Sequence, residues 1–265
     1  MLEDFASGES GTLGRRTSAA GMLLDLSVDA VTAPRQLRLR RAAASAAARR
    51  VLAVSIARPE RAGSAAAAAY ELERAGPHDV QVRLGAARPG AGKWENLNAL
   101  LAANPPAGFD WLLIFDDDVV LPRHFLDPFV FLCERFGFTL AQPAHKHWSH
   151  AAWRVTRRHA RSVARRTRFV EIGPVTAVHA RAFDVLLPFP DLQMGWGLDA
   201  HWGAVAAEHD WALGVVDATP VRHTRAIAGD YDRGAASAEA RAFLAGRPYV
   251  RTAEAQQTVA AYARW

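Results

Sequence analysis

The chain has 265 residues, of which 50% are hydrophobic and 22% charged, so it can bury a large core within one domain. Arginine supplies nearly all the positive charge behind the net +5, because Lys93 and Lys146 are the only lysines. A basic balance favours anionic partners such as phosphates, nucleic acids or lipid surfaces. Cys133 is the only cysteine, which excludes an internal disulfide framework and indicates a reducing compartment.

We expect a cytoplasmic protein, because two signals for export or membrane insertion are missing from the sequence. No apolar run approaches the roughly 18 residues of a membrane-spanning helix. The first five residues carry no basic stretch of the kind that begins a signal peptide.

Residues 1–50 are expected to form an extension that is either disordered or a basic helix. Residues 1–33 show no sustained periodicity and predict mostly disorder. Residues 34–50 carry six arginines and no acidic residue around an alanine run. Two interpretations stay open for this stretch. It is either a helix lying on an anionic membrane, at the inner face, or a solvated helix leading into the domain.

From residue 51 onward, short apolar runs alternate with helical patterns. Strands are predicted at 51–57, 79–84, 111–115, 140–144, 169–179 and 213–221. Helices are predicted from about 64 to 76 and at 93–103, 122–136 and 198–209, and one or two more within 235–264. This alternation predicts one α/β domain over residues 51–233, with a mostly parallel sheet and helices on both faces. Residues 234–265 are expected to be a helical extension packed on the domain.

Residues 145–168 break the rhythm with four histidines and seven arginines. The histidine spacing fits no standard zinc pattern, and no cysteine is nearby. We predict a mobile loop over the active site that orders when a donor binds. A purely solvated loop is the alternative.

The acidic triplet at residues 116–118 follows the most apolar predicted strand. Alternate residues at a strand end point to one face, so Asp116 and Asp118 are expected to face one cleft while Asp117 faces away. In open α/β sheets, that cleft lies beyond the carboxyl ends of the strands. Two carboxylates there suit a hard divalent cation bound together with substrate phosphates. A solvated turn is the alternative.

The second motif is Gly195-Trp-Gly-Leu-Asp199. Its glycines allow a sharp turn close to a ligand, and Trp196 offers a flat apolar face for a sugar ring. Asp199 opens a predicted helix, so it is either a helix N-cap or a general base that takes a proton from an acceptor hydroxyl.

The third motif is Gly214-Val-Val-Asp217, followed by His223. A histidine just past a buried strand is usually structural. If this strand end lies beside the acidic triplet, His223 would complete a metal shell. Arg222 and Arg225 flank it and are candidates for phosphate contact.

Together these motifs resemble the uncharacterised family called domain of unknown function 707. The resemblance rests on the stretches Lys93-Trp94, Phe109–Asp118, Ala141-Gln-Pro-Ala144, Val155-Thr-Arg157, Val170-Glu171-Ile-Gly-Pro174, Gly195–Asp199 and Gly214–Asp217 with His223. They keep the family's order over about residues 90–230. More broadly, the chain resembles nucleotide-sugar glycosyltransferases of the GT-A type, which join a Rossmann-like nucleotide half to a smaller acceptor half.

The resemblance implies a metal-dependent transfer of sugar from a nucleoside-diphosphate sugar to a saccharide or other hydroxyl acceptor. Asp116 and Asp118 match the Asp-x-Asp motif that holds Mn2+ or Mg2+ and the donor diphosphate. His223 matches a late histidine that completes the metal site. Asp199 matches the acidic residue that is often the catalytic base of inverting members.

The sequence departs from the family pattern at two positions. Asp117 stands where glutamate is expected, which has little consequence if that side chain faces away. Leu198 precedes Asp199 where many inverting enzymes carry two acids, which leaves the assignment of the base open.

Further residues are expected to bind the nucleotide-sugar donor and the acceptor. Candidates for nucleotide-sugar binding are Ser55, Arg58, Lys93, Asp116, Asp117, Arg222 and Arg225. Candidates for acceptor binding are Glu171, Trp196, Gly197 and Trp153. For Glu171, an ion pair with an arginine of the preceding segment is the alternative.

Two other functions are compatible with the same residues. A nucleotidyltransferase would share the α/β half and the acid pair. A non-catalytic module would use its arginines on nucleic acid or anionic lipid. The arginines are dispersed and no nucleic-acid motif is present, so a nucleic-acid partner is not expected.

Overall fold

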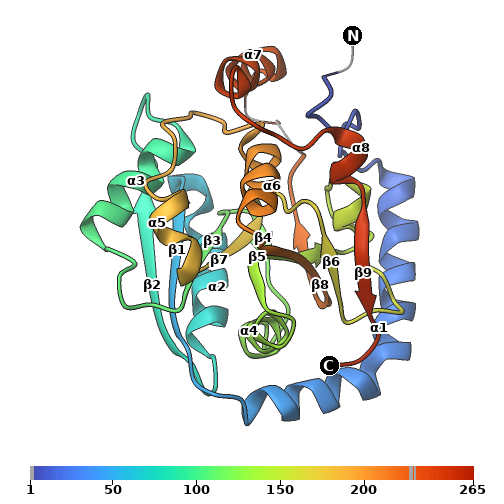
Figure 1. Ribbon diagram of the computed structural model, residues 1–265. Helices are drawn as coiled ribbons and strands as arrows, with labels where there is room; N and C mark the ends of the chain where they lie inside the picture. The colour runs from blue at the N-terminus through green and yellow to red at the C-terminus, as the bar shows by residue number, and fades with distance from the viewer. Residues whose placement is uncertain (1–2, 227–228, 230) are drawn as a thin grey trace.

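A central β-sheet organises the computed structural model, which describes residues 3–226, 229 and 231–265 (Figure 1). The described residues do not include residues 1–2 of the predicted extension. They also do not include residues 227–228 and 230 of the predicted domain. The strands are β1 (Arg50–Ala57), β2 (Asp79–Ala86), β3 (Trp111–Phe115), β4 (Val119–Val120), β5 (Phe138–His145), β6 (Ala164–Thr167), β7 (Val175–His179), β8 (Ala212–His223) and β9 (Thr258–Tyr262).

Helices surround this sheet. They are α1 (Arg15–Ala44), α2 (Ala62–Glu73), α3 (Lys93–Ala103), α4 (Leu126–Arg135), α5 (Phe183–Leu186), α6 (Leu198–Glu208), α7 (Arg233–Leu244) and α8 (Thr252–Ala255), with 3-10 turns η1 (Pro59–Arg61), η2 (Arg154–Thr156) and η3 (Ala180–Ala182). The predicted helix at 93–103 and the predicted strand at 111–115 are confirmed to the residue.

The strands are ordered β2-β1-β3-β7-β5-β8-β6-β9 in the described part of the chain, and β4 pairs with β8. Pairing is parallel between β1 and β2, β1 and β3, and β5 and β8, and antiparallel elsewhere. β1, β2, β3, β5, β8 and β9 therefore run in one direction, and β4, β6 and β7 run in the other. The predicted α/β domain with a mostly parallel sheet is confirmed, with β7 as an antiparallel strand at its centre.

Both faces of the sheet are buried. Leu112 and Ile114 of β3 point into a cluster with residues of α3, α6 and α7. Leu113 and Phe115 point the opposite way, into a cluster with residues of α2 and α4 and the end of α1. The near-continuous apolar runs of the central strands follow from this double burial.

The first helix corrects the prediction of disorder before residue 34, because α1 begins at Arg15. The middle of its buried side is polar, at Asp25 and Thr32, while Leu39 and Ala43 near its end are buried in the core. The Asp25 carboxylate lies 3.3 Å from Nη1 of Arg158, and both groups are buried. Asp29 pairs with the same guanidinium. A helix held by buried ion pairs shows no apolar periodicity, so its sequence does not predict it as an amphipathic helix.

The last strand is a second correction. Residues 258–262, expected to be helical, form β9 and pair with β6 at the edge of the sheet. Pairing with a neighbouring strand decides the conformation of this short stretch, which contains the β-favouring residues Thr258, Val259 and Tyr262. In the described part of the chain, no helix combines the length and apolarity needed to cross a bilayer.

Candidate metal centre and its surroundings

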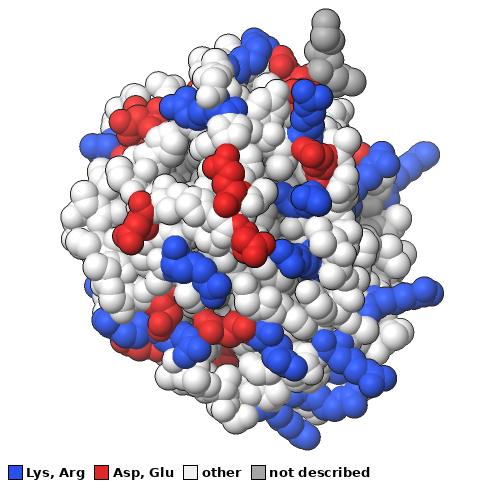
Figure 2. Space-filling view, in the orientation of Figure 1, with Lys and Arg blue, Asp and Glu red and all other residues white. Residues whose placement is uncertain are grey.

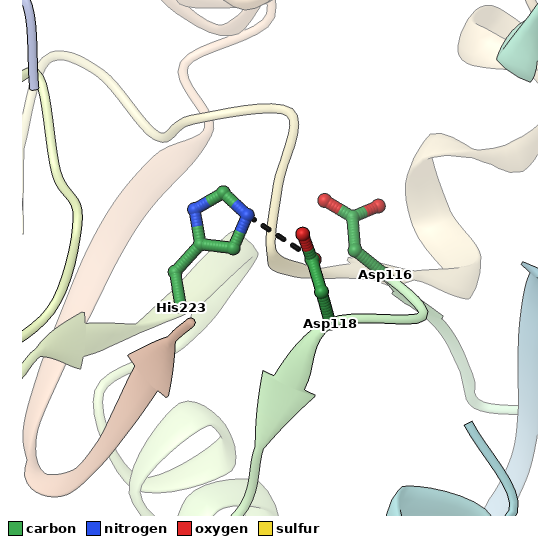
Figure 3. Close-up of side chains that lie close together, drawn as sticks. All are labelled: Asp116, Asp118 and His223. Atoms are coloured by element: carbon green, nitrogen blue, oxygen red, sulfur yellow. Dashed lines mark ion pairs between the residues drawn. The ribbon is translucent and has the colours of Figure 1, made fainter. Parts of the chain in front are cut away.

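The acidic loop begins where β3 leaves the sheet. β3 is fully buried, and the N–H of Asp116 donates to the carbonyl of Pro174 at 2.8 Å, which fixes the start of the loop. Asp116 and Asp118 rise from the same side of the loop, as Figure 3 shows. The expected alternation of their side chains is therefore observed. Nζ of Lys93, at the start of α3, lies 2.6 Å from Oδ1 of Asp116.

His223 reaches this loop through a short antiparallel ladder. Val119 of β4 pairs with His223 at the end of β8. The N–H and the hydroxyl of Thr224 both donate to the carbonyl of Asp118, at 3.1 and 2.9 Å. As a result, Nε2 of His223 lies 3.1 Å from Oδ1 of Asp118 (Figure 3). The sequence assigned His223 to the metal site on the condition that the end of its strand lies beside the acidic triplet. The structure meets this condition.

Asp116, Asp118 and His223 form a group that could hold a metal ion. Each offers one ligand atom, and these atoms all lie within 4.8 Å of one another. Two carboxylate oxygens and one imidazole nitrogen are a suitable donor set for a divalent cation that takes its other ligands from water and phosphate. The residues present therefore fit the expected cofactor.

The charges of this group depend on one another. Burial alone would raise the pKa of Asp118, but the hydrogen bond and charge of His223, with Arg61 and Lys93, hold it below its ordinary value. Burial alone would lower the pKa of His223, and the hydrogen bond to Asp118 raises it instead. His223 and Asp118 thus each favour the charged form of the other.

Arg61 is a site residue that sequence reasoning missed. It ends η1, just after β1, and its Nη1 lies 3.2 Å from Oδ1 of Asp117 and 3.6 Å from Oδ2 of Asp118. β1 and β3 are parallel neighbours, so the residues that follow their ends lie close together. Asp117 is nearly buried and also accepts from the N–H of Arg58 at 3.0 Å. It faces these arginines, away from His223, and its nucleotide contact stays a prediction.

The histidine-rich segment is a folded support for His223, which corrects the expectation of a mobile loop. The hydroxyl of Ser149 accepts from the N–H of His223 at 2.8 Å. The N–H of His150 donates to the carbonyl of His223 at 3.2 Å. Further along, Arg165 in β6 is fully buried and lies 2.8 Å from Asp217. The segment is ordered because its polar groups are satisfied inside the fold.

Asp199 lies in the first turn of α6, and the N-cap of that helix is Gly197. The alternative interpretation of Asp199 as the cap is therefore wrong. Its side chain is buried, and Oδ1 accepts from the N–H of Ala200 at 2.9 Å. Burial raises the pKa of Asp199 to about 7, the charge of Glu171 adds to the rise, and the backbone hydrogen bonds oppose it.

The glycines of the second motif are required by close packing. Gly195 has φ +81°, and a Cβ there would lie 1.8 Å from Nε1 of Trp94. Gly197 has φ +84° at the start of α6. Glu239 of α7, which the sequence did not single out, accepts from the N–H groups of residues 193–195 at 2.6, 3.0 and 2.9 Å. One carboxylate on α7 therefore fixes the turn that precedes Trp196.

Tyr231, which contacts Trp196, was also missed. Its hydroxyl accepts from Nε1 of Trp196 at 3.0 Å. Burial raises its pKa, and the charges of Asp116 and Asp199 add to that rise. Only the fold could reveal this residue, because nothing in its local sequence marks it.

Two of the predicted acceptor residues are placed in the core. Trp153 is 6% exposed and packs against Phe169, with ring centroids 4.3 Å apart. Glu171 is buried and accepts from the hydroxyl of Thr156, and its Oε1 lies 3.4 Å from Nε2 of His145. Glu171 therefore contacts a threonine and a histidine rather than the arginine considered as its alternative partner.

The remaining nucleotide-binding candidates lie in different environments. Ser55 is fully buried in β1, so contact with a nucleotide would require its neighbours to move. Arg222 stacks on Trp148, with Cζ 3.8 Å from the ring centroid. Arg225 is exposed just beyond β8. Their roles, like those of Arg58 and Lys93, stay predictions.

Comparison with solved structures gives distant likenesses, one of which is to GalNAc-T7. No family model matches the chain, so the resemblance to domain of unknown function 707 stays a prediction. No curated protein matches it either. A crystal structure of GalNAc-T7 with UDP, GalNAc and Mn2+ is similar to 68% of this chain at 12% identity, with a TM-score of 0.45. The match covers 44% of that chain, so the present chain matches less than half of the GalNAc-T7 chain's length.

Proposed function

We propose that this chain is a metal-dependent glycosyltransferase of the GT-A type that moves a sugar from a nucleoside-diphosphate sugar to a hydroxyl acceptor. The observation that carries the proposal is the meeting of Asp116, Asp118 and His223 where the parallel strands β1 and β3 end. In open α/β sheets this edge is where nucleotides bind. The motif resemblance described above supports the same reaction.

Asp116, Asp118 and His223 would hold the cation, for which Mn2+ is the stronger candidate because one of the three ligands is an imidazole nitrogen. When bound, the cation supplies Lewis-acid stabilisation of the negative charge on the leaving diphosphate. Lys93 is a second fixed positive charge beside Asp116. It would share in stabilising that charge without any rearrangement of the loop.

Asp199 is the proposed general base, and the proposed stereochemical outcome is inversion. It takes the proton from the acceptor hydroxyl while that oxygen bonds to the anomeric carbon of the donor. The bond between this carbon and the diphosphate breaks, and the nucleoside diphosphate leaves with the bonding electrons. A carboxylate whose pKa is raised to about 7 is matched to proton transfer near neutral pH.

Trp196 and Tyr231 are proposed to bind the acceptor. Trp196 is half-buried beside the turn that leads to Asp199, and its ring lies 6.4 Å from that of Tyr231. Their hydrogen bond holds the indole in one orientation. A fixed indole face packs well on the apolar face of a sugar ring. The base would then lie close to the acceptor hydroxyl.

The metal site is tested first by calorimetric titration of Mn2+ into the metal-free protein. Wild type is compared with Asp118→Asn and with Asp184→Asn, a matched change at an exposed residue of α5. We expect Asp118→Asn to lose Mn2+ binding and Asp184→Asn to keep it. Melting temperatures of all three proteins show whether they are folded. Undiminished Mn2+ binding in folded Asp118→Asn would overturn the proposed metal site.

The reaction is tested with a set of nucleotide sugars and Mn2+. Release of a nucleoside diphosphate, lost in Asp118→Asn and retained in Asp184→Asn, is the expected result. Release of pyrophosphate would identify a nucleotidyltransferase instead. Binding of nucleic acid or anionic lipid that ignores Mn2+, with no nucleotide bound by any of the proteins, would favour the non-catalytic module.

A further inference from the structure

Over residues 19–34, helix α1 exposes apolar side chains and buries polar ones, which is the reverse of a helix that packs on a core. Its exposed large residues include Leu23 at 63%, Leu26 at 58% and Val31 at 81% exposure. Within this stretch the buried residues are Gly21, Asp25 and Thr32, and only the last part of the helix buries the apolar Leu39 and Ala43. The fold of this chain therefore does not account for the apolar face of α1.

The exposed face is mostly uncharged over a long stretch. From Ala19 to Pro34, where the structure describes every residue, the charged residues are Asp25, which is buried, and Asp29, whose side chain is 44% exposed and pairs with Arg158. The exposed residues are Ala19, Ala20, Met22, Leu23, Leu24, Leu26, Ser27, Ala30, Val31, Ala33 and Pro34. At about 1.5 Å per residue, this surface extends for roughly 24 Å along the helix. We call it the apolar face of α1. Isolated exposed leucines are common, but a continuous face of this length indicates a binding surface.

Arginines border the apolar face at both ends. Arg15 and Arg16 precede it, and Arg38, Arg40 and Arg41 follow it, all of them exposed. Of the two acidic residues of the helix, Asp25 is buried and Asp29 is partly exposed. Asp25 and Asp29 both pair with Arg158. Figure 2 shows Lys and Arg side chains gathered along the lower right edge, where α1 runs in Figure 1.

A groove beside the apolar face is lined by more cationic than acidic groups, because Asp29 is the only acidic residue among the described residues that line it and pairs there with Lys146 and Arg158. It has a volume of about 430 Å³ and lies between α1 and the body of the protein. Ala33 and Leu37 of α1 line it together with Arg40, Arg123 and Lys146. Apolar and cationic groups therefore meet along the same side of the molecule.

We propose that α1 docks this protein on an anionic bilayer, with the apolar face of α1 inserted at the level of the headgroups and the flanking arginines on lipid phosphates. An in-plane helix needs an apolar face, a cationic border and access from solvent. α1 lies on the outside of the molecule, so the body does not block its approach (Figure 1). The proposal is independent of the metal site and places the bilayer contact mainly at residues 19–41.

Charge favours a bilayer over a second copy of this chain. In an antiparallel pair of α1 helices, Arg15 and Arg16 of one copy would lie near Arg38, Arg40 and Arg41 of the other. The arginines of the two helices would then repel each other at both ends of the contact. An anionic surface turns the same arginines into favourable contacts that weaken with salt.

The test is flotation of the full chain with vesicles in EDTA. Wild type is compared on phosphatidylcholine alone and on phosphatidylcholine with a quarter phosphatidylglycerol. Leu23→Gln/Leu26→Gln alters the apolar face, and Arg38→Gln/Arg41→Gln alters the cationic border. The matched control is Leu84→Gln/Val185→Gln, which changes two exposed apolar residues on β2 and α5. All of these side chains are exposed, so melting temperatures are expected to stay close to wild type.

We expect wild type to bind anionic vesicles at least ten-fold more tightly than neutral ones, and each α1 variant to lose at least ten-fold in binding. The control variant should bind like wild type. Equal flotation of wild type and Leu23→Gln/Leu26→Gln would overturn the proposal. So would a dimer in solution that this same variant converts to a monomer, because the apolar face would then belong to a second copy.

Discussion

Replacing Asp199 with asparagine is expected to stabilise the protein above pH 7 while removing its activity. The carboxyl is buried, and its pKa is raised from 3.8 to about 7. The folded state therefore holds the proton more tightly than the unfolded chain does. Stability from this group is complete below pH 3.8 and is lost as the pH rises through 7. Asparagine cannot ionise, and its Oδ1 still accepts from the N–H of Ala200.

The size of the effect follows from the pKa. At about 1.4 kcal/mol for each pH unit between 3.8 and 7, ionising Asp199 costs the folded state roughly 4 kcal/mol at pH 8. The free energy of unfolding of Asp199→Asn should therefore exceed that of wild type by about this amount at pH 8. At pH 4 the difference should fall below about 1 kcal/mol, because wild-type Asp199 is then protonated.

Urea unfolding of both proteins in EDTA, at intervals from pH 4 to pH 8, measures this difference. Asp184→Asn, at an exposed position of α5, should follow wild type at every pH. The nucleotide-sugar assay should show a loss of about 100-fold or more in kcat for Asp199→Asn, as expected when a general base is removed. Stability curves for Asp199→Asn and wild type that run parallel from pH 4 to pH 8 would refute the reasoning.

Three further substitutions test how the site is supported. Arg165→Met leaves Asp217 buried without its partner and should lower the free energy of unfolding by about 3–5 kcal/mol in urea; a loss below about 1 kcal/mol would contradict the buried pair. Gly195→Ala places a Cβ against Trp94 at positive φ and should cost at least about 2 kcal/mol, seen as a lower melting temperature. Glu239→Gln weakens the anchor of the turn before Trp196, so it should raise the KM for the acceptor several-fold with Mn2+ affinity unchanged; an equal loss of Mn2+ affinity would point to general unfolding.

Local pattern was enough to predict much of the domain. The apolar run 111–115 and the helical pattern 93–103 coincide with β3 and α3, because each buries its apolar residues against the core. Asp116 and Asp118 were correctly placed on one side of a strand end, since alternation along a strand is a local property. The α/β class followed from the order of these elements.

Long-range packing decided the rest. His223 joins Asp118 only because β4 pairs with the end of β8, across more than 100 residues of sequence. Contacts between distant residues also explain why Trp153 is buried in the core and why residues 258–262 form an edge strand.

Helix α1 shows most clearly what the local sequence determines and what tertiary contacts determine. Its buried side is held by ion pairs between Asp25, Asp29 and Arg158, which carry no periodic apolar signal. The sequence by itself determined the strand–helix order and the acidic loop after β3, because burial patterns and strand alternation act between near neighbours. Only the tertiary structure decided which distant side chains complete the metal group and which face of α1 is exposed, because those depend on contacts between residues far apart in the chain.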